Sequence, residues 1–349
     1  MSGSTRLVCS LLLILSLQSF AQQVEPAPRY EARFNRTRGW TGADGTYSYP
    51  IGDSGVLWSF SDTFFGPVVD GKRTEFTFAN NSHIIQRGED LEFLQAPSFV
   101  PPDRKGWFWM ADGTYQGDFR VLLGQYEKDG SGVFGFRQSG LWYARAIPLG
   151  QRLVVQEYVK LPFFRTAPNL NLTFGSAVLR QGSWDYVYGI KDSDHKRSYV
   201  LARVPSGRMG IPGVWRFYDG ESWSRDPLKV ASLFDGASME SSVHKTRDGG
   251  YLYVGSLDST DRIVARYAPS VSGPWGDSVE VYRAPEVQGE IFSYNAKAHP
   301  HLSSGGRLLI SYNVNTRSLA EVIEKADIYR PRFIWWTPSD PGWLPMDGK

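Results

Sequence analysis

The sequence predicts an all-β protein that forms a single five-bladed β-propeller, and three observations favour this fold. Short runs of aromatic and β-branched residues, bounded by Gly, Asp, Asn or Pro, occur throughout the chain, whereas the spacing of amphipathic helices is almost absent. The 349 residues include 36 Gly, 21 Pro, 12 Trp, 18 Tyr and 20 Phe, a composition typical of many short strands joined by tight turns. In addition, one kind of strand recurs with a nearly constant period.

The recurring strand is aromatic and β-branched and follows a Gly or Asp turn. Its five copies begin at Gly55, Asp118, Trp184, Gly250 and Gly306, which are 63, 66, 66 and 56 residues apart. An Ala-Arg pair on the next strand, at residues 144, 202 and 265, repeats with a similar period. These spacings predict five four-stranded units of about 66 residues each, and such units bury both of their faces only when they stack around a central channel.

An inner strand is expected ahead of each copy, near residues 42–49, 107–113, 174–180, 239–246 and 295–302. A propeller has the shape of a disc with the channel at its centre. In each unit the inner strand starts at one face of this disc and the second strand returns to the same face. The start of the inner strand and the end of the second strand therefore meet beside the channel. The residues at equivalent starting positions are Asp44, Asp112, Ser176, Glu240 and Asn295. The returning strands carry Asp62, Lys191, Asp258 and Asn313. We expect Asp327–Trp336 to complete the fifth blade with the segment before Trp40, which closes the ring.

The first 21 residues have the pattern of a secretory signal peptide. Arg6 precedes an apolar run from Leu7 to about Leu17, and small residues stand three and one positions before the expected cleavage after Ala21. The run is shorter than the ~20 residues of a spanning helix, so no transmembrane segment is expected. Residues 22–349 should then form the single propeller domain of a secreted or periplasmic bacterial protein. The only cysteine, Cys9, would be removed, which leaves no disulfide.

The charge balance bears on the kind of partner. Lys and Arg number 38 against 36 Asp and Glu, so the formal net charge is +2 and a nucleic-acid partner is disfavoured. The chain has no phosphate-binding loop, and its five His, at residues 83, 195, 244, 299 and 301, lack metal-site spacing. We therefore expect no cofactor and no catalytic metal; a structural cation in the channel is the alternative. A monomer that binds a neutral polysaccharide or oligosaccharide fits this near-neutral charge.

Three carboxylates stand among apolar and small residues at predicted strand ends: Asp44, Asp62 and Glu240. A carboxylate in such surroundings is costly unless it is paired, hydrogen-bonded or used in chemistry. Asp44 and Asp112 each precede a Gly, so turn capping is an alternative explanation for both of them. No turn requires Glu240. Two carboxylates that face each other across a channel are what cleavage of a glycosidic bond requires.

Several stretches of the sequence resemble a family of bacterial five-bladed propellers. They are residues 42–45, 58–64, 240–243, 273–275 and 311–315, and above all the Tyr-Asn-Ala-Lys-Ala-His-Pro string at 294–300. The closest resemblance is to the family catalogued as domain of unknown function 5005. A related family, number 4185, contains the endo-D-arabinanases of glycoside hydrolase family 183. The arabinanase and xylosidase propellers are more distantly similar.

The resemblance implies roles for the three carboxylates. Asp44 matches a first-blade Asp that acts as nucleophile or base, and Glu240 matches a fourth-blade Glu that acts as general acid. Asp62 matches an Asp-Thr pair for which substrate binding or pKa tuning is expected. The arabinanase pattern takes a third acid from the third blade, but this chain has Ser176 there, flanked by Gly and Ala.

Other residues are candidates for substrate binding. Asn295, Lys297 and His299 alternate along one strand, so they share a face and could offer donors to sugar hydroxyls; an internal hydrogen-bond network between blades is the alternative. Asp112 and Asn313 are expected on the same face. Trp40 and Trp109 could stack on sugar rings, as could Trp107 and Trp275, while most other rings should pack between blades.

Together these features predict a secreted glycoside hydrolase that cleaves a polysaccharide, with an arabinofuranan as the best single substrate and an endo-arabinanase-like activity. A non-catalytic carbohydrate-binding or surface propeller is the alternative, and a structural scaffold is a third. Retention or inversion at the anomeric carbon would depend on whether the two carboxyl groups lie about 5 Å or about 6.5–9.5 Å apart.

Overall fold

The computed structural model describes residues 22–52, 55–130, 132, 134–167, 169–193, 196–257 and 260–346. The expected signal peptide at 1–21 lies outside the described residues, as do Asp258 and His195. Strands dominate the described part of the chain, which confirms the all-β prediction, and two short helices, α1 (Pro28–Phe34) and α2 (Leu319–Glu324), accompany them. No helix within these ranges is long and apolar enough to cross a membrane.

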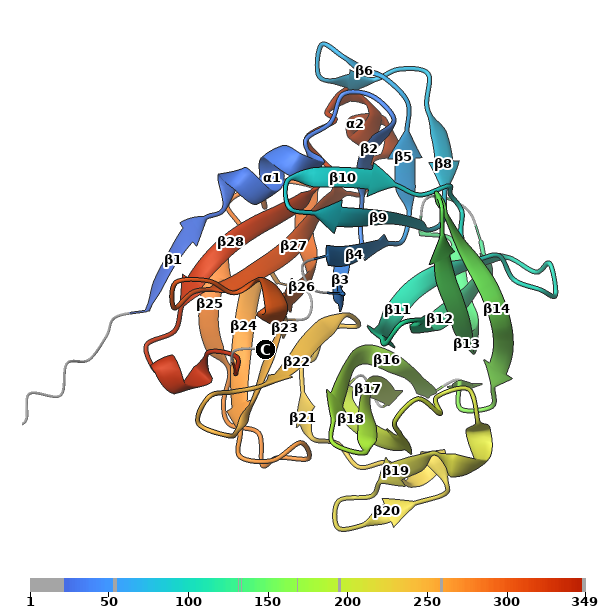
Figure 1. Ribbon diagram of the computed structural model, residues 1–349, viewed down its shortest axis with the longest axis vertical. Helices are drawn as coiled ribbons and strands as arrows, with labels where there is room; N and C mark the ends of the chain where they lie inside the picture. The colour runs from blue at the N-terminus through green and yellow to red at the C-terminus, as the bar shows by residue number, and fades with distance from the viewer. Residues whose placement is uncertain are drawn as a thin grey trace, which may run out of the picture.

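Five sheets of four or more strands are arranged around a centre in a propeller-like manner (Figure 1). In order along each sheet, the first contains β10 (Asp90–Phe93), β9 (Ser82–Arg87), β4 (Gly55–Phe60) and β3 (Tyr47–Ile51). The second contains β11 (Trp107–Tyr115), β12 (Phe119–Lys128), β13 (Phe136–Leu149) and β14 (Arg152–Leu161). The third contains β15 (Arg165–Ala167), β16 (Leu170–Gln181), β17 (Trp184–Ser193), β18 (Lys196–Pro205), β19 (Arg216–Tyr218) and β20 (Trp223–Ser224), with β21 (Phe234–Asp235) beside β18.

The fourth sheet contains β22 (Ser241–Lys245), β23 (Tyr251–Ser256), β24 (Arg262–Ala268) and β25 (Val279–Arg283). The fifth contains β26 (Ile291–Ala298), β27 (Leu308–Thr316), β28 (Pro331–Thr337) and β1 (Gln23–Pro26). Two small sheets lie outside this arrangement, one of β2 (Trp40–Ala43), β5 (Thr63–Phe65) and β8 (Thr77–Ala79), and one of β6 (Val68–Val69) and β7 (Lys72–Arg73). The recurring strand of the sequence is β4, β12, β17, β23 and β27.

The N-terminal strand closes the arrangement. β1 pairs antiparallel with β28, so that Gln23 faces Thr337 and Pro26 faces Ile334. The fifth sheet therefore combines the two ends of the described chain, as expected for the segment before Trp40. Because β1 and β28 are far apart in sequence, this pairing anchors the N-terminal segment in the last sheet.

The core is divided among the junctions between sheets. Five clusters of buried side chains each draw residues from two neighbouring sheets, for example the cluster that joins β4 and β9 of the first sheet to β12 and β13 of the second. Trp58, Trp215 and Trp336 are among the largest fully buried side chains and lie in three of these clusters. The aromatic residues thus serve mainly as packing between sheets, as the sequence predicted.

The first inner strand differs from the prediction. One strand was expected near residues 42–49, but the chain divides there into β2 and β3, which belong to different sheets. Gly45 and Thr46 have φ values of 85° and 48°, so the backbone changes direction between the two strands. Asp44 lies at this change of direction, between the two sheets.

Candidate active site

The five predicted starting positions coincide with interruptions of the inner strands. Register shifts interrupt β11 at 110–113, β16 at 174–177 and β26 at 294–297, and these include Asp112, Ser176 and Asn295. Glu240 directly precedes β22, and Asp44 follows β2. At a bulge or a strand end, a side chain no longer follows the regular alternation of the pleat. Polar side chains at these interruptions can therefore point towards the centre of the arrangement.

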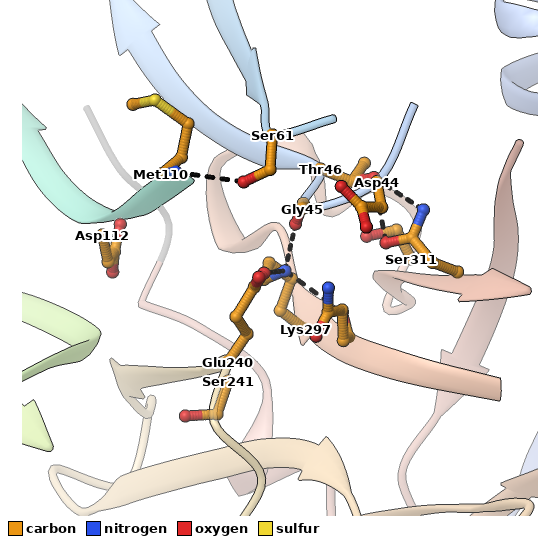
Figure 2. Close-up of polar contacts among 12 residues, drawn as sticks. Asp44, Gly45, Thr46, Ser61, Met110, Asp112, Glu240, Ser241, Lys297 and Ser311 are labelled. Atoms are coloured by element: carbon orange, nitrogen blue, oxygen red, sulfur yellow. Dashed lines mark hydrogen bonds and ion pairs between the residues drawn. The ribbon is translucent and has the colours of Figure 1, made fainter. Parts of the chain in front are cut away.

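A cavity of about 770 Å³ lies at these interruptions. Among the predicted site residues, those that line it are Asp44, Asp62, Trp109, Glu240 and Asn295. Ser176 lines it as well, and so does Trp107. The two carboxylates predicted to be catalytic therefore share one cavity, although they are 196 residues apart in the sequence (Figure 2).

Asp44 is held by two tyrosines. Its Oδ2 accepts hydrogen bonds from Tyr294 Oη and from Tyr329 Oη, each at 2.9 Å, while Oδ1 has no partner among the described residues. Burial raises the pKa of Asp44 to about 8, and the neighbouring carboxylates of Asp62 and Glu240 add to this rise. The bonds from the two tyrosines act in the opposite direction. Asp44 is thus suited to hold a proton near neutral pH.

Asp62 is held by two N–H groups. Its Oδ1 accepts from Asn80 Nδ2 at 2.9 Å and from Trp109 Nε1 at 2.5 Å. Burial raises the pKa of Asp62 to about 6, and these two hydrogen bonds oppose the rise. The backbones of Asp44 and Asp62 also pair, because the Asp44 amide donates to the Asp62 carbonyl at 3.2 Å. Asp62 is therefore fixed beside Asp44 by both side-chain and backbone contacts.

Glu240 is paired with a buried lysine. Lys297 Nζ lies 2.7 Å from Glu240 Oε2, and the side chains are 3% and 14% exposed respectively. Figure 2 shows the contacts of Lys297 with Glu240 and with the carbonyl of Gly45. Lys297 also donates to the carbonyl of Asn295, and its ammonium lies 4.2 Å from the centre of the Tyr47 ring. Burial raises the pKa of Glu240, and the charge and hydrogen bond of Lys297 lower it. Lys297 thereby connects Glu240 to the chain segment that carries Asp44.

Two predicted binding residues lie away from this cavity. Trp40 is 2% exposed, packs against Phe34 and Phe60, and donates from Nε1 to Ser82 Oγ at 3.2 Å. Its expected stacking on a sugar is wrong, because β2 turns the ring into the core. Asn313 is fully buried and donates to the carbonyl of Ala43 at 3.2 Å, so it supports the Asp44 segment and cannot reach a sugar in the cavity.

Asp112, Lys297 and His299 line a second cavity of about 630 Å³. Asp112 accepts from the amides of Gly113 at 2.8 Å and Val178 at 2.6 Å, so it secures a bulge and the neighbouring inner strand. His299 makes contacts of 2.6 Å with Ser48 Oγ and 2.8 Å with Ser311 Oγ. These contacts match the alternative prediction of an internal hydrogen-bond network. Trp275, the remaining stacking candidate, packs near Tyr188 in a sheet junction.

Sequence reasoning missed Tyr294, Tyr329 and Asn80, which hold the two aspartates. Tyr294 stands in the string at 294–300, but nothing in the pattern indicated that its hydroxyl would reach the first sheet. It also missed a set of rings around the cavity: Phe64, Phe76, Phe78, Tyr126, Phe134, Phe136, Phe174 and Phe292. Within the described ranges, no group of three or more His, Cys, Asp or Glu is placed to hold a metal ion.

Comparisons with known proteins agree with the fold. The model of a family described as "Domain of unknown function (DUF5005)" matches residues 28–337. A candidate hydrolase from Bacteroides ovatus has a similar structure, with a TM-score of 0.75 and 19% identity over 93% of both chains. The GH43_1 enzyme from Xanthomonas citri, solved in complex with xylotriose, has a TM-score of 0.50 and 15% identity over 90% of this chain and 89% of its own.

A curated sequence relative is the notoamide biosynthesis cluster protein J of Aspergillus sp. (strain MF297-2). It is 28% identical over 157 residues, and the match spans 43% of this chain and 42% of the relative. The chain thus matches less than half of the length of this protein.

Proposed function

The chain belongs to the DUF5005 family, whose description assigns no activity, and we propose from its site that it is a glycoside hydrolase. The observation that carries the proposal is the placement of Asp44 and Glu240 in one cavity, with Asp62 beside Asp44. Cleavage of a glycosidic bond needs one carboxyl group that protonates the leaving oxygen and one carboxylate that activates water or attacks the anomeric carbon.

The cavity suits an oligosaccharide in size and lining. Its volume of about 770 Å³ lies within the range of small-molecule sites, and Trp107, Trp109 and Tyr126 offer ring faces against which pyranose or furanose rings pack. The structurally similar GH43_1 enzyme was solved with bound xylotriose, which supports a saccharide as the ligand proposed for this cavity. The best single substrate remains an arabinofuranan, with an endo-arabinanase-like activity, as the resemblance to the glycoside hydrolase family 183 propellers implies.

The finer description of the molecule is also part of the proposal. We interpret the five radial sheets as the blades of a single five-bladed propeller, supported by the five shared core clusters and the pairing of β1 with β28. We further propose that residues 1–21 are a signal peptide, that the protein is secreted or periplasmic, and that it is a monomer. N-terminal sequencing of the exported protein should begin at Gln22, and light scattering should give the mass of one chain.

The test of the activity is product release from a glycan panel. The panel contains arabinans of both enantiomeric series, arabinoxylan and galactan, and reducing ends are measured for the wild-type protein, Asp44→Asn and Glu240→Gln. Each substitution should lower the rate by about 10²–10⁴-fold, while Asp261→Asn, at a partly exposed surface ion pair, should leave it unchanged. Unaltered rates in both site variants would refute the assignment. Binding of a glycan without any release of reducing ends would instead favour the non-catalytic carbohydrate-binding alternative.

A further inference from the structure

We propose that Asp44 is the proton donor of the reaction and Glu240 the anionic partner, with Tyr294, Tyr329 and Lys297 as positioning residues. This rests on the proposed function and deepens it. The assignment is opposite to the one that the family resemblance implies, in which Asp44 is the nucleophile or base and Glu240 the acid. It follows from the kinds of hydrogen-bond partner that surround each carboxyl group.

Glu240 is surrounded by groups that favour its charge. Lys297 is the buried cation of the site, and its Nζ makes a 2.7 Å contact with Glu240 Oε2. An ammonium group has three donors and no acceptor, so it cannot accept a hydrogen bond from a protonated carboxyl group. The backbone carbonyls of Gly45 and Asn295 take its other donors, which fixes the ammonium in place. Burial raises the pKa of Glu240, but the charge and hydrogen bond of Lys297, together with a hydrogen bond from Tyr47, favour its carboxylate form.

Asp44 is surrounded by groups that tolerate its neutral form. Its partners, Tyr294 and Tyr329, are hydroxyls, which can donate or accept a hydrogen bond. The partners of Asp62 are the N–H groups of Asn80 and Trp109, which only donate. Two adjacent carboxylates without a cation between them cannot both ionise freely. The N–H donors of Asn80 and Trp109 favour the charged form of Asp62, so the shared proton resides on Asp44. Its Oδ1, which has no hydrogen-bond partner among the described residues, is the oxygen that carries this proton.

The other charged groups of the cavity do not alter this balance. Lys128 of β12 and Arg197 of β18 also line it, and Arg197 makes an ion pair with Asp192 at 2.9 Å. The largest influences on the pKa of Asp44 are burial, the charges of Asp62 and Glu240, and the bonds from the two tyrosines. The pKa of about 8 for Asp44, raised by burial first and by Asp62 and Glu240 next, agrees with a neutral carboxyl group at pH 7.

The reaction balances in this arrangement. Asp44 gives its proton to the glycosidic oxygen while the bond from that oxygen to the anomeric carbon breaks, and the electron pair of the bond stays on the leaving oxygen. Glu240 takes one proton from a water molecule whose oxygen forms the new bond to the anomeric carbon. Transfer of the proton from Glu240 to Asp44 through solvent then restores the starting state. If the Glu240 carboxylate instead attacks the anomeric carbon, a glycosyl ester forms; water hydrolyses this ester in a second step, Asp44 takes the proton of that water, and Glu240 leaves as a carboxylate.

The kinetic test uses leaving groups that differ in their need for a proton. The substrates are the methyl and 2,4-dinitrophenyl glycosides of the sugar that the wild-type protein releases from the glycan panel. Asp44→Asn should lose about 10²–10⁴-fold in kcat/KM on the methyl glycoside but stay within about tenfold on the dinitrophenyl glycoside, whose leaving group needs no acid. Glu240→Gln should lose activity on both. Rescue of Glu240→Gln but not Asp44→Asn by the dinitrophenyl glycoside would overturn the assignment.

A spectroscopic test needs no substrate. Infrared spectra of the protein at pH 7 should contain a protonated-carboxyl C=O band that is absent from Asp44→Asn and present in Glu240→Gln. Loss of the band in Glu240→Gln alone, or in neither variant, would contradict the assignment. If the wild-type protein cleaves no glycoside, the proposed function fails, and this band still decides which carboxyl group carries the proton.

The positioning role of Tyr294 and Tyr329 is tested by the pH dependence of kcat/KM. A proton donor loses activity as the pH rises through its pKa, so the basic limb of kcat/KM should lie near the pKa of Asp44. Tyr294→Phe removes a hydrogen bond that lowers this pKa, so the basic limb should move to higher pH, and Tyr329→Phe should do the same. A purely structural role for the tyrosines would lower the rate without moving the limb, and that result would remove them from the proposal.

Discussion

Replacement of Lys297 by Met tests the buried ion pair of the site. The substitution keeps the length and apolar stem of the side chain but removes the ammonium that contacts Glu240 at 2.7 Å. It also removes the donors to the carbonyls of Gly45 and Asn295. Glu240 then remains in a buried position with no cation beside it.

The expected loss of stability is large because both partners are buried. Removal of one partner of a buried ion pair costs about 3–5 kcal/mol, since the remaining charge is uncompensated. Lys325 provides a matched control, because it contacts Glu321 at 2.8 Å with side-chain exposures of 62% and 26%. An exposed pair of this kind is screened by water, so Lys325→Met should change the free energy of unfolding little.

The loss should also depend on pH in a defined direction. Burial already raises the pKa of Glu240 above its usual 4.5, and Lys297 lowers it, so the variant should have a higher pKa for Glu240 than the wild type. Between pH 4.5 and that raised pKa, the folded variant binds more protons than the unfolded chain. Its free energy of unfolding therefore falls as the pH rises through this window. The penalty of Lys297→Met should be small near pH 5 and full near pH 8.

The assay is urea unfolding of wild type, both lysine variants, Glu240→Gln and the double variant Lys297→Met with Glu240→Gln, each at pH 5, 6.5 and 8. The double variant has no buried charge at this position, so it should be more stable than Lys297→Met at pH 8 and should show less dependence on pH. A penalty of equal size at pH 5 and pH 8, or a double variant that is no more stable than the single one, would refute the reasoning.

Three further predictions concern the support of the site. Gly42→Ala should lower both the free energy of unfolding and the activity, because its Cβ would lie 2.4 Å from the carbonyl oxygen of Tyr329; Gly213→Ala, with open space around it, should unfold like wild type in urea. Trp109→Phe removes a donor that lowers the pKa of Asp62, so a pH titration should give a higher pKa for that carboxyl group. Deletion of the chain through β1 leaves β28 without its outer partner, and calorimetry should show a lower Tm than for the protein that retains β1.

The sequence was sufficient for the recurring strand and for the approximate positions of four inner strands, but not for the division of the first one into β2 and β3. A strand after each Gly or Asp turn is a local signal, and its period fixed where the polar starting positions would lie. The sequence was not sufficient for the orientation of single rings. Trp40 and Trp109 were both expected to stack on sugars, but Trp40 starts β2, which pairs outside the five large sheets, while Trp109 lies in β11 beside the cavity. Pairing between distant segments decides this, and no local pattern encodes it.

Hydrogen-bond partners of the carboxylates were likewise beyond local patterns. Tyr294 and Tyr329 belong to the fifth sheet and its neighbouring turn, yet both reach Asp44, which is more than 200 residues away in the sequence. Tyr329 has a φ of 70°, a conformation that a bulky residue rarely adopts, so its place at the site depends on the surrounding structure. Such contacts arise only once the first and last sheets are joined.

The interruptions of the inner strands also determine what Asp112 does. A bulge leaves backbone amides without ladder partners, and neighbouring side chains satisfy them. Ser61 Oγ accepts from the Met110 amide at 3.0 Å (Figure 2). Asp112 Oδ2 accepts from the Val178 amide at 2.6 Å. Asp112 is thus committed to the backbone of the third sheet, where the arabinanase pattern would place an acid and this chain has Ser176. Asp62 lies between β4 and β5, lines the cavity and is joined to Asp44 by a backbone hydrogen bond. Its negative charge adds to the burial that raises the pKa of Asp44, so the carboxylate that influences Asp44 comes from its own neighbourhood and not from the third sheet.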